Sequence, residues 1–184
     1  MHGRLQLRFG FVVLLAALWC ADKSGVLPLF LLAAAVHEGG HLAVLCLTGG
    51  QSRRLVLNAS GAVLLCHLPP DSLARAAVCL AGPAASLLLT AGAGYAGFYR
   101  LAGASALLGL FNLLPLPPLD GGMALFHLAH GRFPLLRRLL ALTAALALLS
   151  AGIWLYRQNC GIWLLLTGTL ICGQTLKNLA KNAI

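Results

Sequence analysis

The sequence predicts an all-α polytopic membrane protein with about six transmembrane helices and a small β-hairpin between the second and third. Of the 184 residues, 60% are apolar and 9% are charged. A soluble domain carries about 25% charged residues, so these charges cannot cover a surface that faces water. We therefore expect a single membrane-embedded domain over residues 1–184. A cytosolic enzyme, a disordered chain and a secreted disulfide scaffold are excluded.

Long apolar runs define the expected spans. They cover about residues 5–21, 26–47, 73–98, 101–114, 135–156 and 161–176. The fourth is interrupted by Pro115, Pro117 and Pro118, because proline lacks the amide hydrogen that a helix needs, and it is expected to continue to about residue 130. The fifth is rich in Ala and Leu and indicates no chemistry.

Residues 51–68 are too polar for a span and predict the hairpin. Two short runs with strand character, residues 54–57 and 62–66, flank the turn-forming residues 58–61. We expect this hairpin between the second and third spans.

The basic residues predict membrane orientation. The net charge is +9, but the 13 Lys and Arg side chains are scattered between apolar runs, and no basic face interleaved with aromatics predicts nucleic-acid binding. A cytoplasmic N-terminus would place ten of them inside and three outside, which the positive-inside rule favours. The three expected outside are Lys23, Arg100 and Arg157. Both termini are expected to be cytoplasmic.

A polar motif interrupts the second apolar run. His37-Glu38-Gly39-Gly40-His41 reads H-E-x-x-H, which places two histidines one helical turn apart on one face. Both can then ligate one zinc ion, and Glu38 can take a proton from an attacking water. The alternative is chance occurrence with buried, hydrogen-bonded histidines. The two glycines would let another segment approach the metal, or simply allow helices to pack closely.

A catalytic zinc site has three protein ligands, so a third is needed. The chain has four acidic residues, and two of them, Asp22 and Asp71, fall at expected membrane surfaces, where they would cap helices. Asp120 instead follows the proline-rich backbone, which is tolerated in a membrane only when it is buried or lines a cavity. Asp120 is therefore our predicted third ligand of one Zn²⁺ per chain. Rival ligands are His67, His127 and His130.

Two further motifs make a resemblance specific. Residues 112–121 read N-x-x-P-x-x-x-L-D-G, and residues 81–86 read A-G-P-x-x-S. Over residues 26–122 the sequence resembles the site-2 protease (peptidase M50) family of intramembrane zinc metalloproteases, and it is similar to the branch that contains the sporulation protease stage IV sporulation protein FB. The family has Asn where this chain has Ser86.

The resemblance implies a multi-pass protease of a bacterial cell membrane. Its substrate would be a membrane protein cleaved in or near a transmembrane segment, such as a sigma-factor precursor or an anti-sigma factor, and a membrane inhibitor or regulator is a possible partner. Asn112 would bind the substrate backbone or the oxyanion, or else form a structural hydrogen bond. The chain ends eight residues after Leu176, so no C-terminal nucleotide-sensing domain is expected.

Two other classes of function compete with this interpretation. A non-catalytic relative that binds membrane helices as a scaffold would be expected to lose Glu38 or a ligand. A transporter that couples ions through the same residues would more often contain an internal repeat, and none is found in the sequence.

Overall fold

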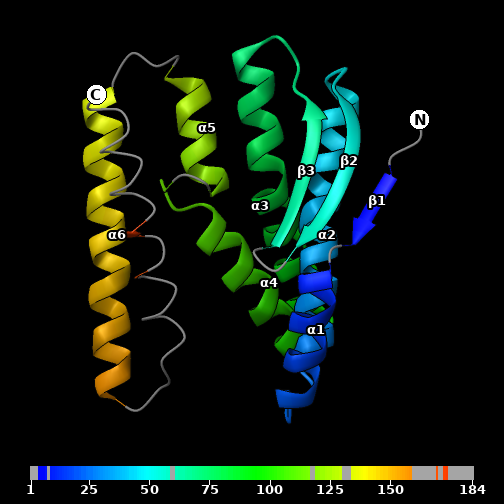
Figure 1. Cartoon of the computed structure of the whole chain (residues 1–184), viewed down its shortest axis with the longest axis vertical. Helices are drawn as coiled ribbons and strands as arrows, with labels where there is room; N and C mark the ends of the chain where they lie inside the picture. The colour runs from blue at the N-terminus through cyan, green and yellow to red at the C-terminus, as the bar shows by residue number, and fades with distance from the viewer. Residues whose placement is uncertain are drawn as a thin grey trace. The chain divides into compact units, whose positions relative to one another are not determined.

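A computed structural model describes residues 4–7, 9–58, 61–116, 119–129, 134–158, 169 and 172–173. The chain divides into two compact units, Met1–Phe111 and Asn112–Ile184. Helices dominate the described residues (Figure 1). The elements are β1 (Arg4–Leu7), α1 (Phe9–Ala21), α2 (Leu27–Leu47), β2 (Gln51–Asn58), β3 (Gly61–His67), α3 (Ser72–Tyr95), α4 (Tyr99–Asn112), α5 (Asp120–Leu128) and α6 (Pro134–Arg157).

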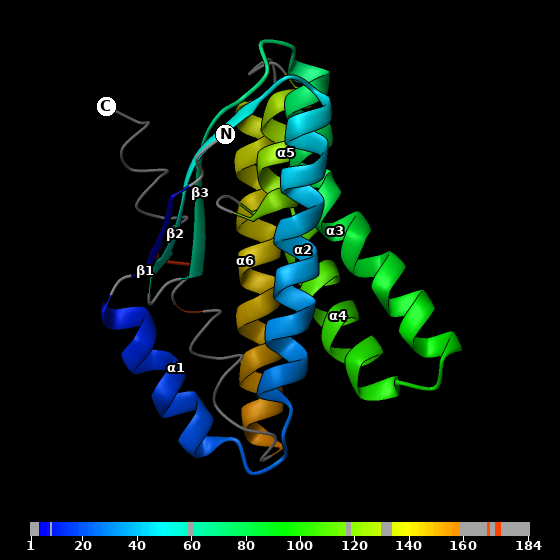
Figure 2. The same cartoon turned by 90° about the vertical axis from the view of Figure 1, so that its right-hand side faces the viewer.

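The sheet of the first unit has the strand order β1-β2-β3. β2 and β3 are antiparallel, with Val56 opposite Val63, and β1 adds to β2 in parallel. β2 also contacts α1 and α2, so the sheet lies beside these helices (Figure 2). The expectation that the first span begins at residue 5 is wrong, because residues 4–7 are a strand and the helix begins at Phe9. Polar and apolar residues alternate over residues 4–7, as is typical of a strand. In the sequence these residues run directly into the apolar segment that follows, so the two elements look like one span.

Acidic side chains hold the starts of two helices in the first unit. Asp71 accepts a hydrogen bond from the Ala74 N–H at 3.1 Å and caps α3. Asp22 accepts from the Leu27 N–H at 2.7 Å and from the Val26 N–H at 3.2 Å, at the start of α2. The bond from Leu27 contributes most to lowering the pKa of Asp22 to about 2. The predicted placement of both acids at helix starts is confirmed.

α2 and α3 form the main helix contact of this unit, and Gly40 lies in it. A Cβ atom at Gly40 would lie 2.6 Å from the Ala81 carbonyl oxygen and 2.7 Å from the Ala85 Cβ. Nothing lies within 4 Å of a Cβ atom at Gly39. The two adjacent glycines therefore differ: Gly40 permits the close approach of α3, whereas Gly39 does not contribute to it.

We expect Gly40→Ala to destabilise the protein and Gly39→Ala to leave it as stable or more stable. Overpacking a helix contact costs about 1–3 kcal/mol, whereas Ala is favoured over Gly in an open helix position by about 1 kcal/mol. Thermal unfolding in detergent, followed by circular dichroism, compares the two variants. Equal unfolding temperatures for both would show that Gly40 is not a packing position.

Two helices in the described part of the chain, α2 and α3, are long and apolar enough to cross a membrane. They have 21 and 24 residues, whereas the apolar helix Phe9–Ala21 has 13. The predicted fifth span, residues 135–156, falls within α6. Of the predicted sixth span, only residues 169 and 172–173 are described. The count of six spans therefore stays a prediction.

The second unit contains the predicted break before Asp120, which is confirmed, since α4 ends at Asn112 and α5 begins at Asp120. Between them the Leu116 side chain is completely buried and clusters with Ala145 of α6. A Cβ atom at Gly121 would overlap the Leu113 carbonyl. Glycine is needed there because the chain returns closely on itself and fixes the start of α5.

Candidate metal centre

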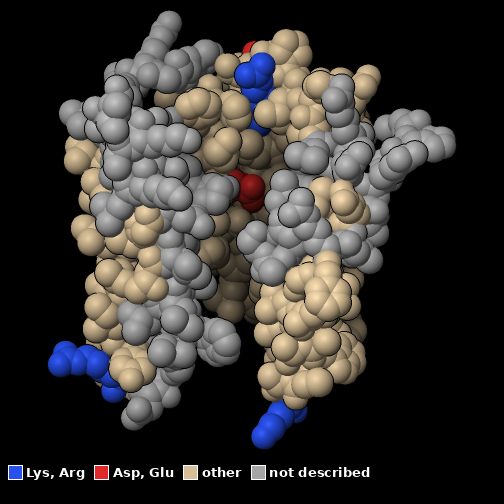
Figure 3. Space-filling view, in the orientation of Figure 1, with Lys and Arg blue, Asp and Glu red and all other residues tan. Residues whose placement is uncertain are grey.

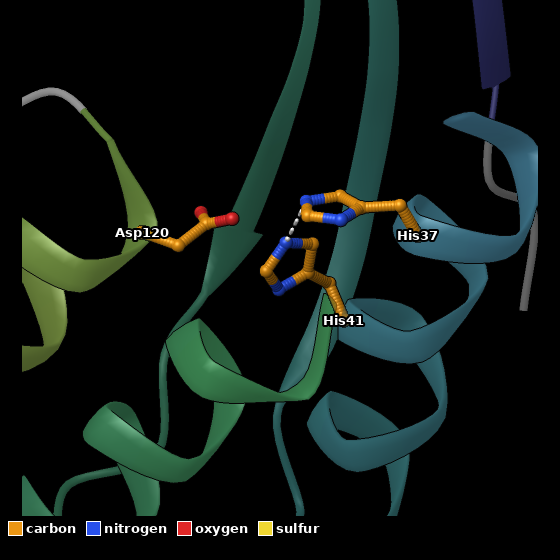
Figure 4. Close-up of side chains that lie close together, drawn as sticks. All are labelled: His37, His41 and Asp120. Atoms are coloured by element: carbon orange, nitrogen blue, oxygen red, sulfur yellow. Dashed lines mark hydrogen bonds between the residues drawn. The ribbon is translucent and has the colours of Figure 1, made fainter. Parts of the chain in front are cut away.

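Two buried histidines of α2 face each other. His37 and His41 are 4% and 9% exposed, and their Nε2 atoms lie 3.3 Å apart (Figure 4). The ring centroids are 4.9 Å apart and the rings are nearly perpendicular. Their spacing of one helical turn places both rings on one face, as the H-E-x-x-H pattern predicts. The two nitrogens that point at each other are those a metal ion would use.

Helix α3 holds the opposite nitrogen of each ring. The His41 Nδ1 lies 2.7 Å from the Val78 carbonyl oxygen, and the His37 Nδ1 lies 2.9 Å from the Ser86 Oγ. A carbonyl oxygen only accepts, so the His41 Nδ1 carries the proton and donates it to Val78. In the neutral ring this leaves a lone pair on the His41 Nε2, as a metal ligand requires.

Between these two contacts, α3 carries Gly82. A Cβ atom at this position would overlap the His41 ring, including Nε2. Val78, Gly82 and Ser86 are four residues apart, so they lie on one face of α3 and meet the two histidines of α2. The close packing of the helices thus depends on the absence of a side chain at Gly82.

Glu38 and Asp120 are both half-buried in helices. Glu38 follows His37 within α2, and Asp120 is the first residue of α5. His37, His41 and Asp120 are side chains of the kinds that can hold a metal ion, and Figure 4 draws all three. Two imidazoles and one carboxylate are a ligand set typical of catalytic zinc. The hydrogen bonds to α3 allow each histidine to keep a lone pair on its Nε2 atom, which is what binding of such an ion requires.

Comparison with known proteins identifies the family. Residues 10–119 match the family model described as Peptidase M50B-like. The chain belongs to this peptidase family. The fold of the M50 peptidase resembles that of the site-2 protease from Methanocaldococcus jannaschii, with a TM-score of 0.66 and 22% sequence identity over 94% of this chain and 89% of that one. No curated protein matches the chain. The protein is therefore a membrane metalloprotease of the site-2 protease type.

The other predicted site residues of this M50 peptidase fall in different places. Asn112 is half-buried at the end of α4. Among the rival ligands, His67 is exposed on β3, His127 is buried near the end of α5, and His130 lies outside the described residues. In the part of the chain that the structure describes, no metal-ligating group besides His37, His41 and Asp120 is found.

Sequence reasoning missed the partners of the histidines in α3. Ser86 differs from the family Asn, which does not by itself indicate a contact with a histidine, and Val78 contributes a backbone atom that no residue type indicates. One signal was present in the sequence. Ser86 is a polar residue in an apolar run, four positions after Gly82, at the same spacing as His37 and His41.

Proposed function

We propose that this protein is a zinc endopeptidase that cleaves a membrane-tethered regulatory protein in or near its transmembrane segment. A sigma-factor precursor or an anti-sigma factor is the class of substrate that the family resemblance favours. The observation that carries the proposal is the pair of buried Nε2 atoms 3.3 Å apart in α2, each ring held from α3 through its other nitrogen. A scaffold that only binds helices would have no need of this arrangement.

His37, His41 and Asp120 are the proposed ligands of one Zn²⁺. When bound, the ion would polarise the scissile carbonyl and favour deprotonation of water. Glu38 accepts the proton of the attacking water and delivers it to the leaving amine. Asn112 is our candidate donor to the substrate backbone or the oxyanion, and its alternative is a structural hydrogen bond to the proline-rich backbone.

The sheet offers an edge to which a substrate segment could bind in extended form, once its helix is unwound. β1 pairs with one edge of β2, and β3 pairs with the other. Among the described strands, β3 pairs only with β2, so we propose that a substrate strand adds to its outer edge by β-augmentation. The alternative is that the β2–β3 pair only covers the site.

We also propose a multi-pass topology with both termini in the cytoplasm. In the first unit, the Arg100 guanidinium donates to the Ser24 carbonyl, so the α1–α2 loop and the start of α4 lie at the same end. Lys23 in that loop and Arg100 are two of the three basic residues assigned outside. Arg75 lies near the other end of α3 and donates to the Pro69 carbonyl at 2.7 Å. On the face drawn in Figure 3, most described residues are neither basic nor acidic, and the few Lys and Arg side chains lie apart from one another.

The function is tested by reconstituting the full chain with zinc in vesicles. The probes are single-span sigma-factor precursors and anti-sigma factors carrying an N-terminal tag, and mass spectrometry locates any cleavage. We expect zinc-dependent cleavage within or beside the span of at least one substrate. Cleavage that survives complete zinc removal, or that falls only in soluble domains, would contradict the proposal.

We expect Asp120→Asn to lose most of the one zinc bound per chain, because the amide supplies no negative charge to the metal. The matched control is Asp71→Asn, since Asn caps a helix about as well as Asp and position 71 only caps α3. Zinc is measured by inductively coupled plasma mass spectrometry on purified protein. Retention of full zinc in Asp120→Asn would show that another residue is the third ligand.

A further inference from the structure

Ser86 is not one of the proposed metal ligands, but its hydroxyl forms a hydrogen bond with His37. We propose that Ser86 is a positioning residue for the metal centre. Its hydroxyl orients the His37 ring and can hydrogen-bond to the Nδ1 atom in either neutral tautomer of that ring. The Nε2 atom can therefore carry a proton in one state and bind a metal ion in the other. The inference rests on the metal centre of the proposed function.

Ser86 contacts both α2 and α4. It is completely buried, and its carbonyl oxygen accepts a hydrogen bond of 2.8 Å from the Ser105 Oγ. Gly109 of α4 also lies against it, since a Cβ atom at Gly109 would be 2.9 Å from the Ser86 Cβ. The bond from Ser105 reaches the backbone carbonyl of Ser86 and not its hydroxyl, and the Ser86 Oγ lies 2.9 Å from the His37 Nδ1.

The two histidines are held by different kinds of partner. The Val78 carbonyl accepts only, and this restricts neutral His41 to the tautomer with its proton on Nδ1. The Ser86 hydroxyl both donates and accepts, so it pairs with His37 in either tautomer. The two partners thus fix the tautomer of His41 and allow either tautomer of His37.

The contact between the two Nε2 atoms explains why His37 needs to adopt either tautomer. Two lone pairs 3.3 Å apart would repel, so two neutral rings fit this contact when one Nε2 donates to the other. Since His41 has its proton on Nδ1, the donor is the His37 Nε2–H, and the Ser86 hydroxyl then donates to the His37 Nδ1. When a metal ion is bound, the His37 Nε2 needs its lone pair, and the Nδ1 carries the proton and donates to the Ser86 Oγ.

The change between the two states conserves the charge of the His37 ring. The Nε2 gives its proton to water as the metal ion binds, the Nδ1 takes one proton from water, and the Ser86 hydroxyl keeps its hydrogen and rotates from donor to acceptor. An alanine at position 86 would leave the Nδ1 buried without this partner in either state. Partners that orient a ligating histidine typically contribute about 10–100-fold to metal affinity.

The test compares Ser86→Ala with Ser105→Ala in the full-length protein purified in detergent. Ser105 is the matched control because it is an equally buried serine that contacts Ser86 and not the histidine in the described hydrogen bonds. Metal-free protein is titrated with zinc against a chelator of known affinity, and with Co²⁺ while the visible spectrum is recorded. Thermal unfolding of the metal-free variants is followed in parallel.

We expect Ser86→Ala to bind zinc about 10–100-fold more weakly than the wild type and to shift the visible bands of bound Co²⁺. Ser105→Ala is expected to keep the wild-type affinity and spectrum. Wild-type affinity in Ser86→Ala, or an equal loss in both variants, would overturn the role of Ser86 while leaving the metal centre in place. A wild-type protein that binds neither metal would overturn both proposals.

Discussion

Glu38→Gln is expected to slow peptide cleavage by about 10²–10⁴-fold while the metal stays bound. Gln has nearly the same size as Glu but no basic oxygen, so it cannot take a proton from the attacking water. A positioned general base contributes about 10²–10⁴-fold to the rate, and we expect a loss in this range. Single-turnover cleavage of a tethered substrate in vesicles measures the rate, and metal analysis of the same preparation measures bound zinc.

The neighbouring position provides the control for this experiment. Gly39→Ala changes the next residue of α2, where a Cβ atom meets nothing within 4 Å, and it should cleave at the wild-type rate. Cleavage by Glu38→Gln at a rate close to that of Gly39→Ala would remove Glu38 from the mechanism. Loss of zinc together with activity would instead make Glu38 a residue on which metal binding depends.

Gly82→Ala is expected to lose both zinc and cleavage. The added methyl group would occupy the space of the His41 ring, so either the ring leaves its position or α3 moves away from α2. Displacement of the ring also breaks the bond to the Val78 carbonyl that fixes its tautomer. Zinc affinity, measured by competition with a chelator, should fall at least as far as in the Ser86→Ala variant.

Gly92→Ala is the control within the same helix, because a Cβ atom at Gly92 meets nothing within 4 Å. It should keep zinc, cleavage and thermal stability. If Gly82→Ala also kept its zinc, the close approach of α3 to the His41 ring would not be required for metal binding.

The arrangement of the H-E-x-x-H motif was predictable because its geometry is local. His37, Glu38 and His41 lie within one turn of a single helix, and helical spacing alone places both histidines on one face. Asp120 could be predicted as a ligand because an acidic side chain is unfavourable in an apolar region unless it has a function, and the chain has few other acidic residues. The helix caps at Asp22 and Asp71 were also local patterns.

What could not be predicted depends on which helix faces which. Gly39 and Gly40 are equivalent in sequence, and only the packing of α3 distinguishes them. Ser86 is 49 positions from His37, so their hydrogen bond depends on how α2 and α3 align. β1 was missed for another reason, since four residues with strand alternation directly precede an apolar helix.

The contact between Val78 and His41 means that part of the metal centre is encoded by no side chain. Any amino acid at position 78 would present the same carbonyl to the His41 Nδ1, provided that α3 keeps its place. A scan that replaces each residue in turn would therefore report only the packing of the buried Val78 side chain, although its oxygen sets the protonation of a proposed ligand. The contribution would become visible only if the peptide bond itself were altered, for example by replacing the amide with an ester.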